Sequence, residues 1–360
     1  MTQQEKNRYS RQILIPEFGE EGQQKLKAAK VLVIGCGGLG SPILLYLAAA
    51  GIGTIGLVEN DRVDESNLQR QILYTTQSVG KAKIDEAEKH LKALNPFIVI
   101  EKHTTRLEAS NALAIFENYD LIIDGSDNFP TRYLVNDACV LLNKPYIYGA
   151  IYRFEGQVAV FNYKGSSTYR DLFPEPPTPD MAPNCAEAGV LGMMAGIIGS
   201  LQANEAIKII AEIGEPLAGK LLIVEALSMN FRTFKVVKNK LLAPITKLID
   251  YQAFCGLKSE SITSITFQEF ENWKNEGREF QLIDVREKHE YEDYNIGGLS
   301  TPFSELDIHT SNIRKNIHVI VHCQSGIRSQ KAIKYLKEKY GFDNLINLEG
   351  GLSAARHETL

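Results

Sequence analysis

The first 240 residues alternate short apolar runs with helical patterns in a way that predicts a parallel α/β sheet. Residues 31–36 and 54–59 have the pattern of short buried strands, with an apolar helix over Ser41–Ala50 between them. A strand, a glycine loop, a helix and a second strand in this order imply parallel pairing. The run Leu121 to Ile123 predicts another strand, and polar residues from Asp124 to Asn128 follow it. Ligands bind at the carboxyl ends of strands in open α/β sheets, so these polar residues are candidates for a site.

Further apolar runs predict the strands that extend and close this sheet. Strand patterns occur at 145–150, 157–161, 221–225 and 232–237, and small and apolar residues over 188–213 predict a long helix. The proline-rich stretch from Phe173 to Pro179 cannot form regular structure, so we expect an exposed, semi-rigid loop there. The expected fold class is therefore α/β, with a Rossmann-like, mostly parallel sheet and a mixed or antiparallel extension.

A second, smaller α/β pattern follows a change of character around residues 240–265. Strand patterns at 282–285 and 319–322 and a helix pattern near 329–340 predict a separate small α/β domain. A length of 360 residues is enough for one large and one small core. We place the first domain at 1–245, the linker at 246–260 and the second domain at 261–360.

Composition and charge exclude several classes of protein. The net charge of -5 gives no general attraction to nucleic acid or anionic membranes. The sequence has no apolar run of roughly 18 residues, the length that a membrane span needs, and its polar N-terminus does not resemble a signal peptide. The cysteines number five and are scattered without a CxxC pair, which argues against a disulfide framework and a clustered zinc site. We expect a cytoplasmic protein with no nucleic-acid or membrane partner.

The loop VLVIGCGGLGSP, from Val31 to Pro42, is a candidate phosphate-binding site. It follows a predicted strand and opens a helix, so that backbone N–H groups and the helix dipole can hold phosphate. Its glycines Gly35, Gly37, Gly38 and Gly40 are candidate nucleotide contacts. The spacing by itself fits ordinary dinucleotide binding equally well. Glu59, at the end of the next strand, could accept a hydrogen bond from a ribose hydroxyl.

The polar residues after that strand favour a site that cuts ATP over one that only holds a dinucleotide. Arg70 and Lys83 are cations suited to β- and γ-phosphates or to departing pyrophosphate. Asp127, at a strand end, could hold Mg²⁺ together with phosphate oxygens. Other polar candidates for nucleotide contacts are Asp61, Asn67, Gln71 and Asn128. A dehydrogenase is disfavoured, because nothing in the sequence suggests a pocket for hydride transfer.

The segment from Cys323 to Ser329 has the pattern of a loop that stabilises a cysteine anion. Cys323 follows an apolar strand, and a helix is predicted directly afterwards. The residues Gln324, Ser325, Gly326, Ile327 and Ser329 can wrap backbone N–H groups around the sulfur, and Arg328 adds a fixed charge. A phosphatase-like cradle is also physically feasible, although the short loop favours the smaller sulfur anion.

Residues 5–240 resemble the ThiF/MoeB/HesA family, relatives of ubiquitin-activating enzymes. The matching strings are RYSRQ, GCGGLGSP, SNLQRQ, VGKAK, DGSDN, NDAC and NCAEAGVLG. The resemblance implies MgATP-dependent adenylation of the C-terminal Gly-Gly of a small ubiquitin-like sulfur carrier. It further implies that Arg70, Lys83 and Asp127 act on phosphates and Mg²⁺, and that Gly38 lines the nucleotide. Arg11 would reach the ATP site of the partner subunit, so the resemblance implies a homodimer.

Residues 262–353 resemble a rhodanese domain. The matching strings are LIDVREKHEYEDYNIGG, HCQSGIRS and NLEGGLSA. The resemblance implies that Cys323 carries a persulfide, which a sulfur donor such as a cysteine desulfurase would load. It also implies that Asp284 and Arg286 brace the persulfide loop as a pair.

The sequence departs from the first family's pattern at several positions. Its ribose-binding Asp is replaced by Glu59, and the CxxC pairs that hold zinc in many members are replaced by Thr168–Asp171 and by Lys240–Ile245. Thiolate ligands are absent there, so we expect no zinc and expect Leu241 and Leu242 to hold that edge by apolar packing. Cys185, within NCAEAGVLG, is a candidate covalent acceptor of the carrier or else a buried filler.

Together these observations predict a fused adenylyltransferase and sulfurtransferase. The favoured pathway is molybdopterin biosynthesis, through carboxylate activation and sulfur transfer from Cys323. Thiamine thiazole synthesis and tRNA thiolation use the same chemistry on other carriers and stay open. Two further alternatives are adenylation of a substrate that is not a carrier protein, and a non-catalytic binding module.

Overall fold

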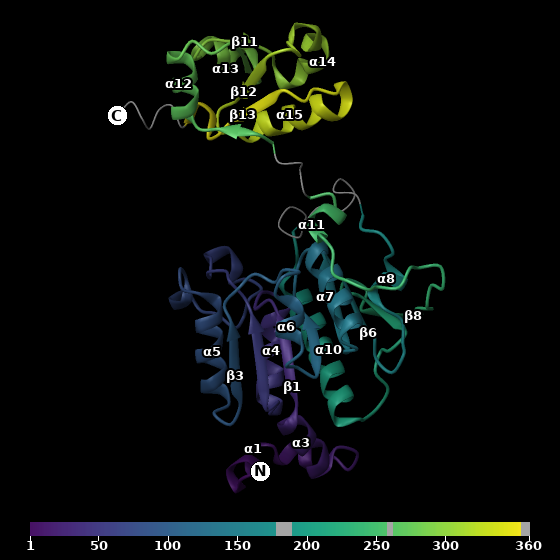
Figure 1. Cartoon of the computed structure of the whole chain (residues 1–360). Helices are drawn as coiled ribbons and strands as arrows, with labels where there is room; N and C mark the ends of the chain where they lie inside the picture. The colour runs from purple at the N-terminus through teal and green to yellow at the C-terminus, as the bar shows by residue number, and fades with distance from the viewer. Residues whose placement is uncertain (178–188, 258–261, 354–360) are drawn as a thin grey trace. The chain divides into compact units, whose positions relative to one another are not determined.

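The computed structural model describes residues 1–177, 189–257 and 262–353. The chain forms two compact units, Met1–Leu257 and Lys258–Leu360, which are considered separately below (Figure 1). Cys185 lies outside the described residues. Among the helices that are described, none is both long enough and apolar enough to span a bilayer.

The first unit is built on an eight-stranded sheet with the order β3-β2-β1-β4-β5-β6-β7-β8. The first five of these strands pair in parallel, and β5 to β8 pair antiparallel. The strands are β1 (Lys30–Ile34), β2 (Thr54–Val58), β3 (Val99–His103), β4 (Leu121–Asp124), β5 (Tyr146–Tyr152), β6 (Glu155–Phe161), β7 (Lys220–Glu225) and β8 (Asn230–Lys235). The mostly parallel sheet with an antiparallel extension is thus confirmed.

Helices cover both faces of this sheet. They are α1 (Gln3–Arg8), α2 (Ser10–Ile13), α3 (Gly19–Ala28), α4 (Gly40–Ala50), α5 (Lys83–Leu94), α6 (Ala112–Phe116), α7 (Phe129–Leu141), α8 (Tyr169–Leu172), α10 (Gly192–Ala211) and α11 (Tyr251–Phe254). The 3₁₀ turns η1 (Glu65–Asn67) and η2 (Thr76–Ser78) lie between β2 and α5.

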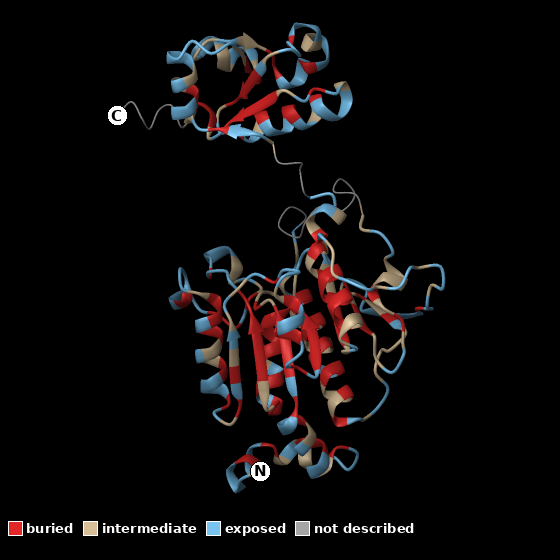
Figure 2. Ribbon diagram, viewed as in Figure 1, coloured by how far each residue is buried: buried red, intermediate tan, exposed pale blue. Residues whose placement is uncertain are grey.

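Alternate residues of the central strand β1 enter opposite cores. Val31 and Val33 pack with α3, α4, α5 and α10, whereas Leu32 and Ile34 pack with α6 and α7. All four of these side chains are buried, as the red central strands in Figure 2 show. A strand that is apolar on both sides must be covered on both sides, which explains why β1 appears in the sequence as a continuous apolar run.

The second unit contains a five-stranded sheet with the order β11-β10-β12-β13-β9, and every pairing in it is parallel. Its strands are β9 (Ser264–Ile265), β10 (Phe280–Asp284), β11 (Leu299–Ser300), β12 (His318–His322) and β13 (Leu345–Leu348). Its helices are α12 (Phe267–Asn275), α13 (Lys288–Asp293), α14 (Leu306–His309) and α15 (Ile327–Tyr340), with 3₁₀ turns η4 (Phe303–Glu305) and η5 (Thr310–Asn312). The second small α/β domain is confirmed.

Individual elements differ from the prediction where the sequence is polar. Strand β3 and helix α5 were not predicted, because each exposes many of its residues and carries few apolar side chains. The helix predicted over 188–213 is α10, Gly192–Ala211. Residues 173–177 form neither helix nor strand, and the rest of the proline-rich stretch lies outside the described residues. Helix α11 falls inside the segment 246–260 and buries Tyr251 against the first unit.

Candidate functional site

The glycine loop connects β1 to α4 by a close backbone approach. Gly35 adopts a φ of 86°, a left-handed conformation that favours glycine. A Cβ on Gly40 would lie 2.1 Å from the carbonyl oxygen of Gly35, so no larger residue fits at the start of the helix. The helix N-terminus therefore reaches the carboxyl end of β1, where its unpaired N–H groups can bind an anion.

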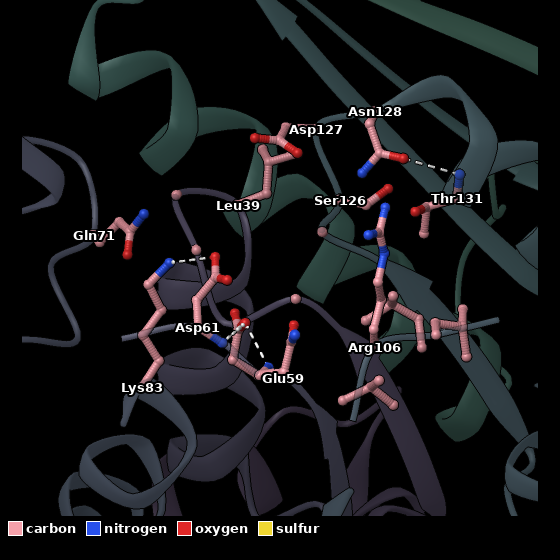
Figure 3. Close-up of a pocket in the computed structure, with 18 of the residues that line it drawn as sticks. Leu39, Glu59, Asp61, Gln71, Lys83, Arg106, Ser126, Asp127, Asn128 and Thr131 are labelled. Atoms are coloured by element: carbon pink, nitrogen blue, oxygen red, sulfur yellow. Dashed lines mark hydrogen bonds and ion pairs between the residues drawn. The ribbon is translucent and has the colours of Figure 1, made fainter. Parts of the chain in front are cut away.

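A cavity of about 340 Å³ lies over the carboxyl ends of the strands. The glycine loop forms its floor, and its walls are formed by residues that follow β2, β3 and β4 and by Ile151 near the end of β5. Figure 3 shows Lys83, Asp61 and Gln71 on one side of this cavity and Ser126, Asn128 and Thr131 on the other. The position is the one where open α/β sheets bind ligands.

Glu59 is a nearly buried carboxylate at the end of β2. Its Oε1 accepts the backbone N–H groups of Asn60 and Asp61, each at 2.9 Å, and its Oε2 accepts that of Cys36 at 3.0 Å. These donors hold the carboxylate in place between two loops. A carboxylate oxygen accepts about two hydrogen bonds, so Oε2 retains a lone pair for a ribose hydroxyl.

Cations lie beside this carboxylate in the same cavity. The Lys83 side chain is buried, and its Nζ lies 3.3 Å from Oδ2 of Asp61. Arg70 lines the cavity and donates to the carbonyl oxygen of Ser66 at 3.1 Å, which leaves most of its N–H groups available. A lysine and an arginine beside a helix N-terminus form a strongly anion-binding wall.

Several buried polar atoms of the cavity lining lack hydrogen-bond partners. Among the described residues these include Oε1 of Gln71, Oγ of Ser126 and Nε of Arg132. Buried polar groups in native proteins are normally paired, so unpaired atoms around one cavity indicate a polar ligand. A nucleotide fits this lining, because it brings hydroxyls, ring nitrogens and phosphate oxygens.

The site residues predicted from the sequence divide into those that line the cavity and those that do not. Lining residues are Gly35, Gly37, Gly38, Glu59, Asp61, Arg70, Gln71, Lys83, Asp127 and Asn128. Gly40 shapes the loop from beneath, and Asn67 forms a capping box with Asp64. Arg11 is exposed on α2, next to the helix that precedes β1, and does not line the cavity of its own chain.

Sequence reasoning missed the part of the lining that follows β3 and begins α7. The residues concerned are Thr105, Arg106, Leu107, Thr131 and Arg132. Figure 3 shows the Arg106 side chain extending into the cavity. Thr131 and Arg132 lie just beyond the polar segment from Asp124 to Asn128, which carried the signal for this part of the site. Strand β3 was not predicted, so the residues that follow it had no assigned place.

Many family members hold a zinc ion where this chain has Thr168–Asp171 and Lys240–Ile245, and apolar packing was predicted to replace it. The structure shows polar contacts at the first of these segments. Leu241 is 95% exposed, so the prediction that it packs there was wrong. Arg170 forms a two-point ion pair with the buried Asp137, with both N···O distances at 2.8 Å. Tyr251 donates to the same carboxylate at 2.8 Å, and the Arg170 guanidinium lies 4.6 Å from the ring of Phe254. In the described part of the chain, no group of His, Cys, Asp or Glu side chains is arranged to hold a metal.

In the second unit, Cys323 begins a tight loop between β12 and α15. Its side chain is 1% exposed, and Oγ of Ser329 lies 3.6 Å from the sulfur. Gly326 has a φ of 84°, and α15 begins at the next residue. A Cβ on Gly351 would lie 2.2 Å from the Cys323 carbonyl oxygen, so the turn around Gly351 closes over the loop. The residues from Cys323 to Ser329 thus form the short loop at a helix N-terminus that the sequence indicated.

Two ion pairs surround this loop. Asp284 and Arg286 are both buried and form a close pair, with Nη2 to Oδ2 at 2.7 Å, as a bracing role requires. Arg328 pairs with Glu290 at 2.6 Å, which raises the pKa of Arg328. Its charge is thus shared with a carboxylate and is not directed at the sulfur alone.

His322 is buried directly below the cysteine loop. Neither ring nitrogen has a hydrogen-bond partner within the described residues, although Nε2 lies 3.8 Å from Oδ2 of Asp284. Burial lowers the pKa of His322 to about 4, so the ring is neutral at physiological pH.

Comparison with known proteins gives matches over both units. Residues 9–243 match the model of the ThiF family, and residues 266–358 match the Rhodanese-like domain. The chain is 46% identical to the probable adenylyltransferase/sulfurtransferase MoeZ of Mycobacterium tuberculosis, over 98% of this chain and 93% of that protein. It is 41% identical to the adenylyltransferase and sulfurtransferase MOCS3 of Anopheles gambiae, over 96% of this chain and 86% of that one. It is 52% identical to a sulfur carrier protein adenylyltransferase of Thermus thermophilus, over 71% of this chain and 99% of that protein.

Among solved structures, the first unit is similar to MccB from E. coli. The crystal structure of MccB with ATP has a TM-score of 0.58 and 25% identity, covering 65% of this chain and 73% of that one. MccB with MccA-N7isoASN has a TM-score of 0.59 and 24% identity, covering 66% and 73%. These similarities support the fold of the sheet.

Proposed function

The chain belongs to the ThiF family, and from that premise we propose that it adenylates the C-terminal carboxylate of a ubiquitin-like sulfur carrier and then transfers sulfur to it. The observation that carries the proposal is the cavity itself. It combines a fixed carboxylate for ribose, two cations beside a helix N-terminus, and buried polar atoms that lack partners. MoeZ and MOCS3, which match nearly the whole chain, are both named as adenylyltransferases and sulfurtransferases.

In the first reaction a carboxylate oxygen of the carrier would attack the α-phosphorus of ATP. The new C–O–P linkage forms as the bond between the α-phosphorus and the bridging oxygen breaks, and pyrophosphate leaves with that electron pair. Arg70 and Lys83 would offset the charge on the departing pyrophosphate. Asp127 is exposed at the cavity rim, where its carboxylate would bind a Mg²⁺ ion together with phosphate oxygens. The ion would neutralise part of the phosphate charge.

In the second reaction the terminal sulfur of a Cys323 persulfide would attack the acyl-adenylate carbonyl. AMP leaves, and the carrier becomes joined to Cys323 through an acyl persulfide. A cellular thiol would then attack the Cys323 sulfur, releasing the carrier thiocarboxylate and forming a mixed disulfide on Cys323. A second thiol resolves that disulfide, so two thiols supply the two electrons. The loop at the start of α15 suits this role, because helix N–H groups stabilise anionic sulfur.

The partners and pathway follow from the same resemblance. The names of the relatives favour molybdopterin biosynthesis, and a cysteine desulfurase is the proposed sulfur donor. A homodimer would bring Arg11 of one subunit to the ATP site of the other. The four cysteines within the described residues are free thiols, which suits the reducing cytoplasm that persulfide chemistry requires.

The test is ATP–pyrophosphate exchange with the purified protein, adding in turn each candidate carrier from the same genome that ends in Gly-Gly. Exchange that depends on one carrier would support adenylation and identify the pathway. Exchange without any carrier would favour a substrate that is not a carrier protein. A Cys323→Ala variant should keep exchange and lose thiocarboxylate formation from a persulfide donor, and unchanged thiocarboxylate formation would refute the role of Cys323.

A further inference from the structure

Arg132 is a buried arginine in the wall of the nucleotide cavity, and no described residue accepts a hydrogen bond from it. It lies in the first turns of α7, is 7% exposed, and lines the cavity. Its Nε has no partner, and within the part of the chain that the structure describes its side chain makes neither a hydrogen bond nor an ion pair. Its guanidinium lies over two aromatic rings, 5.3 Å from the Phe129 ring centre and 5.7 Å from that of Tyr148.

This arrangement is costly in the free protein. A buried charge is normally paired and hydrogen-bonded, because the removal of an ion from water is unfavourable. Aromatic faces offset part of that cost. They accept no hydrogen bonds from the guanidinium N–H groups, which point outward in the plane of the group. Asp124 is a buried carboxylate that attracts the Arg132 guanidinium electrostatically, and its oxygens accept hydrogen bonds from Tyr146 and from the backbone N–H of Ser126. This attraction offsets part of the cost of burial, but Nε of Arg132 still lacks a hydrogen-bond partner among the described residues. Arg132 is therefore arranged to receive an anion from the cavity.

The place of Arg132 in the sheet separates it from Glu59, Arg70 and Lys83, although Asp127 and Asn128 follow the same strand as Arg132. Glu59, Arg70 and Lys83 follow β2, on the β1–β2–β3 half of the sheet. Arg132 follows β4 and packs against Tyr148 of β5, on the opposite half. The strand order reverses between β1 and β4, which is where such sheets open a crevice that holds ligands on both sides. The same separation is visible in Figure 3, where Thr131 lies across the cavity from Lys83.

We propose that Arg132 binds the terminal carboxylate of the acyl substrate and positions it for attack on the α-phosphorus. This inference rests on the proposed adenylation. The planar guanidinium matches a carboxylate through two parallel hydrogen bonds. One carboxylate oxygen would attack phosphorus while the other stays on Arg132, and no proton is transferred. The cation also offsets the repulsion between two anions, the carboxylate and the triphosphate, which must approach to bonding distance.

The experiment compares Arg132→Met, Arg132→Lys and Arg70→Met. Calorimetry gives the Kd for ATP, and ATP–pyrophosphate exchange gives the KM for the carrier. Arg132→Met should raise the carrier KM by about 10- to 100-fold, as expected for losing charge-assisted hydrogen bonds, while the ATP Kd changes by less than about 3-fold. The carrier KM of Arg132→Lys should lie between the values for Arg132→Met and the wild type. Arg70→Met should weaken exchange without this selective effect on the carrier.

A merely structural role for Arg132 would give a different result. Nε of Arg132 has no hydrogen-bond partner among the described residues, so Arg132→Met should lower the urea midpoint only slightly. A packing role instead predicts a large fall in the urea midpoint together with changes in both the ATP Kd and the carrier KM. An ATP Kd that worsens as much as the carrier KM in either Arg132 variant would assign the residue to the nucleotide and overturn the inference. If the wild type exchanges normally and both Arg132 variants match it, only this subsite fails. If the wild type shows no exchange with any substrate, the adenylation proposal itself fails.

Discussion

The ion pair between Arg170 and Asp137 offers the sharpest test of how the first unit is held together. Asp137 is 2% exposed and Arg170 is 14% exposed, and two hydrogen bonds of 2.8 Å join them. Arg170 also lies over the rings of Tyr133 and Phe254, at 5.0 and 4.6 Å. Arg170→Met therefore removes the charge and the fork but keeps an apolar stem against the rings.

The expected loss of stability can be worked out from these contacts. Removing one partner of a buried ion pair costs about 3–5 kcal/mol. The Asp137 carboxylate would retain hydrogen bonds from Tyr251 and from Asn136, so we expect the lower end, about 3 kcal/mol. With a urea m-value of about 3 kcal/mol/M, this corresponds to a midpoint shift of about 1 M. Arg170→Lys should lose less, because it keeps the charge but not the two-point geometry.

The chain provides its own control for this measurement. Its single tryptophan, Trp273, lies in α12 of the second unit, so tryptophan fluorescence follows that unit alone. We expect urea unfolding of Arg170→Met at pH 7 to move a far-UV circular dichroism transition to lower urea and to leave the fluorescence transition in place. A loss below about 1 kcal/mol, the value of an exposed ion pair, would refute the reasoning, as would an equal shift of both transitions.

Three other predictions test the two sites. Glu59→Gln should raise the Kd for ATP by about 10-fold in calorimetry, because one amide oxygen cannot replace a carboxylate that accepts three backbone N–H groups. An unchanged Kd would contradict this geometry. Gly351→Ala should abolish sulfur transfer while sparing ATP–pyrophosphate exchange, because its Cβ would overlap the Cys323 carbonyl oxygen; activity at the wild-type level would show that the turn adapts. Burial lowers the pKa of His322 to about 4, whereas in the unfolded chain the ring binds a proton near pH 6.5. The second unit therefore has its full stability above pH 6.5 and loses stability as the pH falls toward 4. By pH 5 the loss should be about 2 kcal/mol by Trp273 fluorescence in urea, and His322→Leu should lack this slope; equal slopes in both proteins would exclude His322 as the source.

Local patterns predicted the elements that are buried on both faces and the loops at their ends. The run from Val31 to Ile34 is apolar because helices cover both sides of β1. Burial on both sides therefore produces a continuous apolar run that can be recognised in the sequence. The glycine loop and the Cys323 loop were predicted because each needs particular residue types within a few positions. Helix α5 and strand β3, which expose many residues, carry no such signal.

The sequence by itself therefore determined the fold class and many of the residues that line the cavity, since strand ends and turn chemistry are local properties. Only the tertiary structure decided which side chains meet. Arg170 and Asp137 are far apart in the chain, and so are Arg132 and Tyr148; their contacts depend on how α7, α8 and β5 pack. The exposure of Leu241 reversed a packing prediction for the same reason, because whether an apolar side chain is covered depends on its neighbours in space.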